Sequence, residues 1–196
     1  SQGGTKGKPK AAAVATRFAR PPGWASAIPV VDIHPGEMFS KPTWEIKQEA
    51  AFNTGRRAQD FLVSREQFRD FELTLRIRPE TAGQVGVSVR IGNVDSPMRS
   101  GLCWLVGVST AAGQTQGINR TLGLVRDIEE GPVLKLQDWN DLKVSCQGQT
   151  VQLSLNGELC KSLQLPGGSD PAGAIALVSD STSASFDDVK ITELPS

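Results

Sequence analysis

Two segments of this chain alternate apolar and polar residues, 71–78 and 84–91, and their polar positions carry the best candidates for ligand chemistry. The candidates are Glu72, Arg76, Ser88 and Arg90. Guanidinium, hydroxyl and carboxylate groups of this kind form hydrogen bonds with sugar hydroxyls or with a ligand carboxylate. We expect the four side chains to line the polar face of adjacent strands as a ligand-binding surface, with an ordinary solvated sheet face as the alternative.

The sequence assigns no catalytic residue. Glycoside hydrolysis ordinarily needs two carboxylates that face each other across the sugar. Glu72 has no evident partner on another strand, and the cluster Asp127, Glu129 and Glu130 precedes a Gly-Pro pair and fits a solvated loop. The single histidine, His34, lies in a proline-rich segment, where a packing or solvent role is favoured over that of a general base.

No metal or cofactor site follows from the residue spacing either. The three cysteines are Cys103, Cys146 and Cys160. They lack a C-x-x-C spacing, and one histidine leaves too few ligands for zinc. We therefore expect the cysteines to be buried and to pack as small hydrophobic side chains. A structural Ca²⁺ at Asp180, Asp187 and Asp188 is the one cofactor considered, because hard cations take several oxygen ligands. The spacing of these aspartates matches no Ca²⁺ loop.

The charges of the chain balance overall but are unevenly distributed. The 21 basic and 21 acidic residues create no global field of the kind that favours nucleic-acid binding. Residues 1–42 carry six basic side chains against Asp32 and Glu37, a net charge of +4, which leaves −4 for residues 43–196. No run of 18 apolar residues exists, so we expect no membrane span.

Residues 1–42 have the composition of an extended tail rich in glycine, lysine, alanine and proline. Such a segment buries too little apolar surface to offset the entropy lost on ordering. We expect either that it wraps its own domain or that it binds a neighbouring protein subunit. The candidates for partner binding are Lys6, Lys8, Lys10, Arg17, Phe18, Arg20 and Trp24, with the two aromatic residues as apolar anchors.

Residues 43–196 have the pattern of a β-sandwich: about a dozen short strands, frequent turn signals and no convincing helix. The segment 71–78 should place Phe71, Leu73, Leu75 and Ile77 in the core. The segment 102–108 is nearly all apolar, as expected of a central strand covered on both faces. Residues 110–117 should form a polar loop, and Trp104 and Trp139 are expected in the core.

The strongest hairpin signal is Asn156-Gly157, because both residues tolerate positive φ. Leu159, Leu163 and Leu165 should share one face of the strand that follows. A strict two-residue turn would put Leu159 on the other face, so we expect a bulge or a longer loop. A whole strand then separates Cys146 from Cys160, about 10 Å, which excludes a disulfide.

Seven motifs occur in an order that resembles the 3-keto-disaccharide hydrolase family, formerly a domain of unknown function. They are Trp44-Glu-Ile46, Asp60-Phe-Leu-Val-Ser64, Phe68-Arg-Asp-Phe-Glu-Leu73, Trp139-Asn140, Leu153-Ser-Leu-Asn-Gly157, Gly173-Ala-Ile-Ala-Leu177 and Phe186-Asp-Asp-Val-Lys-Ile191. The resemblance covers roughly residues 43–194. It implies an all-β, concanavalin A-like jelly-roll sandwich of two curved antiparallel sheets, whose concave face binds saccharide in many relatives.

The chain departs from the family pattern at three strands. Where relatives have an Asn-Ser-Gly strand running to an arginine, the segment 82–90 keeps only Arg90, and the closing Phe-Arg-Asn-Ile motif appears as Phe186-Asp-Asp-Val189. Where relatives have an acidic Glu-x-Gln-x-x-Asp strand, the segment 102–108 has no carboxylate. These departures favour a protein that is not an enzyme.

The sequence therefore predicts a non-catalytic accessory or assembly subunit. Its tail would tether it by protein–protein interaction to a larger complex, including one associated with a membrane. The alternative is a carbohydrate-binding module, or a divergent sugar hydrolase, that acts at the concave face. Relatives are commonly exported and the chain begins at Ser1, which fits a processed precursor, so we expect a periplasmic or secreted location.

Overall fold

The computed structural model describes residues 24–26, 43–47, 50–64, 66–111, 114–123, 127–129, 134–168 and 172–195. These residues form fourteen strands and no helix. The strands are β1 (Trp24–Ser26), β2 (Trp44–Lys47), β3 (Ala50–Thr54), β4 (Asp60–Ser64), β5 (Phe71–Pro79), β6 (Gly83–Ile91), β7 (Leu102–Ala111), β8 (Gln114–Gly123), β9 (Asp127–Glu129), β10 (Asn140–Gln147), β11 (Thr150–Leu155), β12 (Glu158–Gln164), β13 (Ala174–Asp180) and β14 (Ser183–Glu193). In this part of the chain no helix is long and apolar enough to cross a membrane.

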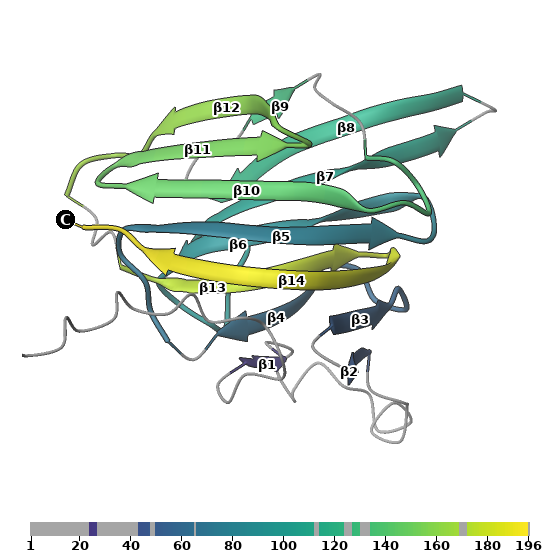
Figure 1. The fold of residues 1–196 in the computed structure, drawn as a ribbon, viewed down its shortest axis with the longest axis horizontal. Coiled ribbons are helices and arrows are strands. Elements are labelled where there is room, and N and C mark those ends of the chain that lie inside the picture. Colours follow the sequence, from purple (N-terminus) through teal and green to yellow (C-terminus); the bar gives the residue numbers. More distant parts are fainter. Residues whose placement is uncertain are drawn as a thin grey trace, which may run out of the picture.

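The strands build two seven-stranded antiparallel sheets that pack face to face (Figure 1). Sheet A has the order β1-β4-β13-β6-β7-β8-β9, and sheet B has the order β12-β11-β10-β5-β14-β3-β2. In Figure 1, β10, β5 and β14 of sheet B lie in front of β7, β6 and β13 of sheet A. The predicted all-β jelly-roll sandwich is confirmed.

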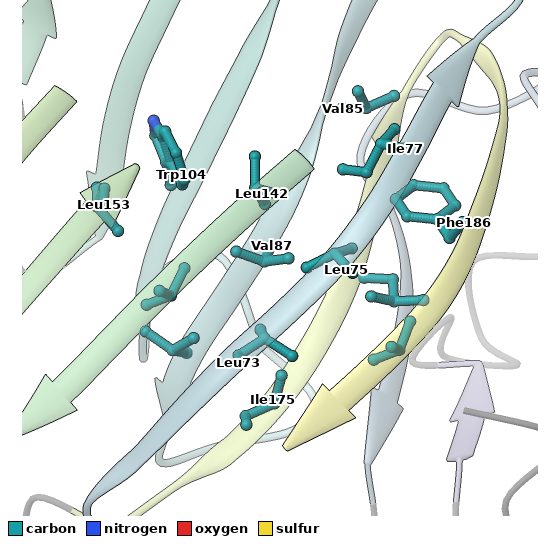
Figure 2. Close-up of a cluster of buried hydrophobic side chains, with 14 of the residues drawn as sticks. Leu73, Leu75, Ile77, Val85, Val87, Trp104, Leu142, Leu153, Ile175 and Phe186 are labelled. Atoms are coloured by element: carbon teal, nitrogen blue, oxygen red, sulfur yellow. The ribbon is translucent and has the colours of Figure 1, made fainter. Parts of the chain in front are cut away.

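The core between the sheets follows from the alternation along β5. Phe71, Leu73, Leu75 and Ile77 are at most 2% exposed, as predicted. Figure 2 shows Leu73, Leu75 and Ile77 together with Phe186 of sheet B, and with residues such as Val87 and Ile175 of sheet A. Burying one such side chain stabilises the fold by roughly 1.5–3 kcal/mol. These four side chains of β5 therefore contribute a large part of the free energy that the core supplies.

A buried carboxylate links the edges of the two sheets. Asp60 on β4 is 1% exposed and accepts hydrogen bonds from Trp44 Nε1 at 3.0 Å and from Asn53 Nδ2 at 2.9 Å. Trp44 and Asn53 belong to β2 and β3 of sheet B, whereas Asp60 belongs to sheet A. The first two family-like motifs, at Trp44 and Asp60, thus have a structural explanation: buried polar groups need partners, and these supply each other.

Two expectations about local structure were wrong. Residues 110–117, expected as a polar loop, lie largely in the long hairpin of β7 and β8, in which Thr110 pairs with Thr115. Residues 127–129, expected as a loop, form the short edge strand β9, which pairs with β8. Polar side chains do not exclude a strand at the rim of a sheet, where backbone pairing decides the conformation.

Candidate functional site

A groove with a volume of about 700 Å³ crosses the outer face of sheet B. It is lined by Thr74, Leu75, Arg76, Asp141, Leu142, Lys143, Gln152, Ser154, Gly157, Leu159 and Asp188. The polar members point outward because their neighbours in sequence, such as Leu73 and Val144, point into the core and strand side chains alternate between faces. The groove therefore lies on the far side of sheet B from the core.

Strand register arranges these side chains in rows across the sheet. Lys190, Thr74, Lys143, Ser154 and Leu159 are successive partners on β14, β5, β10, β11 and β12. Neighbouring strands lie about 4.8 Å apart, so one row spans roughly 19 Å. In the adjacent row Arg76 pairs with Asp141, with 3.7 Å between Nε and Oδ1. The rows suit an extended ligand that crosses the strands.

A bulge in β14 places the second groove carboxylate. The pairing with β5 shifts register between Asp187 and Lys190, and Asp188 has φ 54° there. Asp188 lines the groove and forms an ion pair with Lys190, 3.5 Å from Oδ1 to Nζ. Bulges re-aim side chains in this way, and they are frequent at binding sites.

The tight turn between β11 and β12, followed by a second bulge, places the apolar side chain Leu159 at the groove. The tight turn, with φ 51° at Asn156 and 82° at Gly157, pairs Leu155 with Glu158, so Leu159 lies opposite Ser154 and is 56% exposed. The bulge that we expected follows Leu159 rather than preceding it. The expectation that Leu159 shares a face with Leu163 and Leu165 was therefore wrong for Leu159, because the turn fixes its register first.

Two asparagines hold the loop that enters β10. Asn140 Oδ1 accepts hydrogen bonds from Lys135 N at 2.9 Å and from Asn156 Nδ2 at 3.1 Å, and Asn156 Oδ1 accepts from Asp141 N at 2.8 Å. This network sets Trp139 beside Arg76, whose Cζ lies 5.0 Å from the ring centroid. Trp139 is half-buried at the surface, so its expected core position was wrong, whereas Trp104 is in the core as predicted.

The charges that line the groove cancel. Arg76 and Lys143 provide two positive charges, and Asp141 and Asp188 provide two negative charges. Lys143 also contacts Glu72, with 2.9 Å between Nζ and Oε2. Together with the hydroxyl and amide groups, the lining both donates and accepts hydrogen bonds, which is what a neutral polyhydroxylated ligand requires.

Comparison with known proteins identifies the domain. Residues 30–192 match the family described as the 3-keto-alpha-glucoside-1,2-lyase-like domain. The chain belongs to this family. The resemblance seen in the sequence is thereby confirmed. No curated protein sequence is significantly similar to the chain.

Solved structures show the same sandwich at low sequence identity. A candidate glycosyl hydrolase from Parabacteroides distasonis has TM-score 0.61 and 16% identity over 79% of this chain and 85% of that chain. The carbohydrate-binding module CBM66 from Bacillus subtilis has TM-score 0.60 and 14% identity over 87% and 96%. The catalytic domain of an endo-1,3-beta-glucanase from Thermotoga petrophila has TM-score 0.52 and 11% identity over 89% and 92%. The fold is thus of the kind found in carbohydrate-binding modules and glycosidases.

In this 3-keto-alpha-glucoside-1,2-lyase-like domain the four predicted ligand residues do not share one face. Glu72 and Arg76 lie on the outer face of sheet B, but Ser88 lies in sheet A, buried on its outer face with Oγ donating to Pro97 O at 3.0 Å. Placing them on adjacent strands was wrong because β5 and β6, although consecutive, belong to opposite sheets. Of the four, Arg76 lines the groove.

Arg90 is turned into the sandwich by a third bulge. β6 shifts register against β13 at this point, and Arg90 has φ 54° and is 4% exposed. Its Nη2 lies 3.1 Å from Arg69 O and 3.6 Å from Asp70 Oδ1. Among the described residues its Nε and Nη1 have no hydrogen-bond partner. The arginine that the family pattern keeps therefore occupies the interior, where strand alternation alone would have placed it on the surface.

The remaining candidates separate widely. The tail candidates Lys6, Lys8, Lys10, Arg17, Phe18 and Arg20 lie outside the described residues, as does His34, and only the backbone of Trp24 is described, in β1. Asp180 accepts a hydrogen bond from Gln59 N, Asp187 from Asp188 N, and Asp188 pairs with Lys190. Within the described part of the chain no three His, Cys, Asp or Glu side chains gather as a metal site. Cys103, Cys146 and Cys160, all of them described, form no disulfide.

The groove residues that sequence reasoning missed are Asp141, Lys143, Gln152, Ser154 and Asp188. All but Asp188 occupy the outward positions of the two alternating segments 141–146 and 151–155, so a signal existed. On sequence alone, these outward positions are interpreted as ordinary solvent-exposed residues. Alternation does not reveal that β10 pairs with β5, because this pairing joins residues about 70 positions apart.

Proposed function

We propose that this protein is a non-catalytic carbohydrate-binding domain that holds a neutral saccharide in the groove on the outer face of sheet B. The observation that carries the proposal is the charge-balanced polar lining of that groove, with Leu159 as an exposed apolar contact at its side. Sugar hydroxyls both donate and accept hydrogen bonds, and the C–H face of a sugar ring packs on apolar side chains.

The two carboxylates of the groove do not favour hydrolysis. The Asp141 side chain is 78% exposed and pairs with Arg76, and the Asp188 side chain is 40% exposed and pairs with Lys190. A catalytic acid of a glycosidase is instead a carboxyl group held in an apolar surrounding that keeps its proton. Binding without turnover is therefore the function that this arrangement supports best.

The test is a glycan array of neutral and acidic saccharides, followed by calorimetry on the ligands that bind. We expect a neutral saccharide to bind and Arg76→Ala to weaken its affinity about 10-fold, the loss of roughly one hydrogen-bonded contact. The matched control is Arg78→Ala, which removes the next outward arginine of β5, paired with Glu80 and outside the groove lining. Equal effects of both variants would contradict the groove as the site.

A turnover assay with 3-keto-glycosides separates binding from catalysis. We expect no product. Turnover by the unmodified protein that is lost in both Asp141→Asn and Asp188→Asn would show that the groove is an active site and would overturn the non-catalytic proposal. Loss of turnover with unchanged saccharide affinity would identify the two aspartates as its catalytic pair.

A second proposed function is that of an accessory subunit attached to a larger assembly by the N-terminal tail. The observation that favours it is that residues 1–29 precede the family match and carry five of the six basic residues of the tail. Co-purification of the full chain and of a chain lacking residues 1–23 tests it. Identical sets of associated proteins would contradict a tether.

A location outside the cytoplasm is the setting we propose for a saccharide-binding domain of this family. Two of its three thiols, Cys103 and Cys146, are buried and so are protected from oxidation there. Cell fractionation with an antibody against the domain tests the location, and recovery in the cytosolic fraction alone would contradict it.

A further inference from the structure

Sheet A carries a second apolar layer on its outer face, away from the core. Its members are Phe61, Val63, Ile91, Cys103, Leu105, Ala174, Ala176 and Val178. All come from β4, β6, β7 and β13, and none is more than 6% exposed. The outer face of a two-layer sandwich is ordinarily solvated and polar. Burial of eight apolar side chains there requires a third layer of chain above the sheet.

The segment 92–101 supplies part of this third layer. Met98 packs against the cluster, and Ser88 Oγ donates a hydrogen bond to Pro97 O at 3.0 Å. The hydrogen bond lies over the β6 side of the face, because Ser88 belongs to β6. Met98 is a described residue outside sheet A that covers this cluster. The side of the face formed by β4, which carries Phe61 and Val63, needs a further cover.

Strand β1 shows which part of the chain reaches that side. It pairs antiparallel with β4, with Trp24 opposite Ser64 and Ala25 opposite Val63. The 23 residues before Trp24 therefore enter sheet A at the end of β4 that carries Val63 and Ser64. An extended segment of this length reaches about 75 Å. Crossing from β4 to β7 takes only three strand spacings, about 15 Å.

The composition of residues 1–23 matches the face. An apolar run, Ala11-Ala-Ala-Val14, is followed by Phe18, which Arg17 and Arg20 flank, and three lysines precede the run at Lys6, Lys8 and Lys10. Small apolar side chains can lie flat on a sheet that is itself rich in alanine, such as Ala174 and Ala176. The family match begins only at residue 30, so this segment is an addition to the family domain.

We propose that residues 11–23 of this chain dock on the apolar outer face of sheet A and form the rest of the third layer that buries it. The apolar run and Phe18 cover the β4 and β13 side, and the lysines before them stay in solvent. The free energy comes from removing both apolar surfaces from water, and β1 lowers the entropic cost because it already fixes one end of the segment. This docking is independent of the saccharide groove, which lies on the other sheet.

The first experiment compares the full chain with a chain that begins at Trp24 and so keeps β1. We expect the shortened chain to bind the dye ANS several-fold more strongly, or to self-associate in size-exclusion chromatography with light scattering. Added peptide of residues 1–23 should restore the behaviour of the full chain, and a peptide with Phe18→Asp should not. Equal dye binding and equal mass for the two chains would overturn the proposal.

The second experiment keeps the full length, so it holds if the shortened chain does not fold. A spin label at Phe18→Cys, in a chain with Cys160→Ser, should broaden the methyl NMR signals of Ala176 and Val178 at every protein concentration. The control is the same label at Lys6→Cys, which should broaden them less. No broadening, or broadening that grows with concentration as expected for a second copy, would overturn the proposal.

Discussion

On the outer face of sheet A eight apolar side chains are at most 6% exposed, whereas the outer face of sheet B presents residues such as Thr74, Lys143 and Ser154. β13 has six buried residues in succession, but β10 alternates buried and exposed. Sheet A thus behaves as a middle layer, apolar on both sides. Sheet B has a core face and a water face, and its water face is free to bind a ligand because the fold does not depend on it.

The largest expected effect tests this contrast directly with one new charge on each face. Leu105→Asp places a carboxylate in the buried outer face of sheet A and removes a packed side chain, so the free energy of unfolding should fall by about 4 kcal/mol or more. Thr74→Asp places the same group between lysines on sheet B and should change it by less than about 0.5 kcal/mol. Urea unfolding measures both, and similar losses would contradict the two-face description.

The buried ion pair of Arg90 gives the next effect. Asp70 Oδ1 lies 3.6 Å from Arg90 Nη2 and accepts a hydrogen bond from Gly148 N at 2.9 Å. Asp70→Ala leaves the buried guanidinium without its counter-charge and should cost about 3 kcal/mol. Arg90→Met removes the guanidinium and leaves the Asp70 carboxylate, which is 10% exposed and keeps its hydrogen bond from Gly148 N, so it should cost less than half as much. Thermal and urea unfolding compare the two, and a larger loss for Arg90→Met would contradict the guanidinium as the group that depends more on the pair.

Cys146, whose thiol lies near Arg90, makes the free energy of unfolding fall at alkaline pH. Burial raises the pKa of its thiol from 9.0 to about 11, although the Arg90 guanidinium lowers it in part. The folded state holds this proton more tightly than the unfolded chain, so the stabilisation is complete below about pH 9 and is lost as the pH rises to 11. We expect a fall of roughly 2 kcal/mol in the free energy of unfolding over that interval.

The control for the alkaline effect is Cys146→Ala. The chain has no tyrosine, and its lysines and other two cysteines, which also titrate in this window, are shared by both proteins and so cancel in the comparison. Unfolding free energies measured above about pH 8 in steps of about one pH unit should fall more steeply for the unmodified protein than for the variant. Parallel curves would show that the thiol does not govern this dependence.

The smallest effect on stability belongs to the groove. Asp141→Ala removes an exposed ion pair with Arg76 and should change the free energy of unfolding by less than about 0.5 kcal/mol. The same variant should weaken saccharide binding several-fold if the groove is the site. A stability loss above about 1 kcal/mol with unchanged binding would reverse the roles assigned to the two faces.

The sequence predicted the fold from alternation and turn chemistry. Phe71, Leu73, Leu75 and Ile77 repeat every second residue, and no other regular structure buries all four on one side. The apolar run 102–108 likewise indicated a strand covered on both faces, and Trp104 and Leu105 now lie in the core and in the outer layer of sheet A. These features are local, so one sequence is enough to read them.

The candidate site depended on pairings that local patterns do not encode. Alternation showed that Arg76 and Ser88 point away from the core, but not that β5 and β6 belong to different sheets. Two bulges then moved Arg90 inward and brought Asp188 to the groove, because one extra residue in a strand reverses the side to which a side chain points. The tight turn at Asn156-Gly157 brought Leu159 there. The sequence by itself determined which residues are buried or polar along each strand; only the tertiary structure decided which polar residues meet, since that depends on the order of strands in the two sheets.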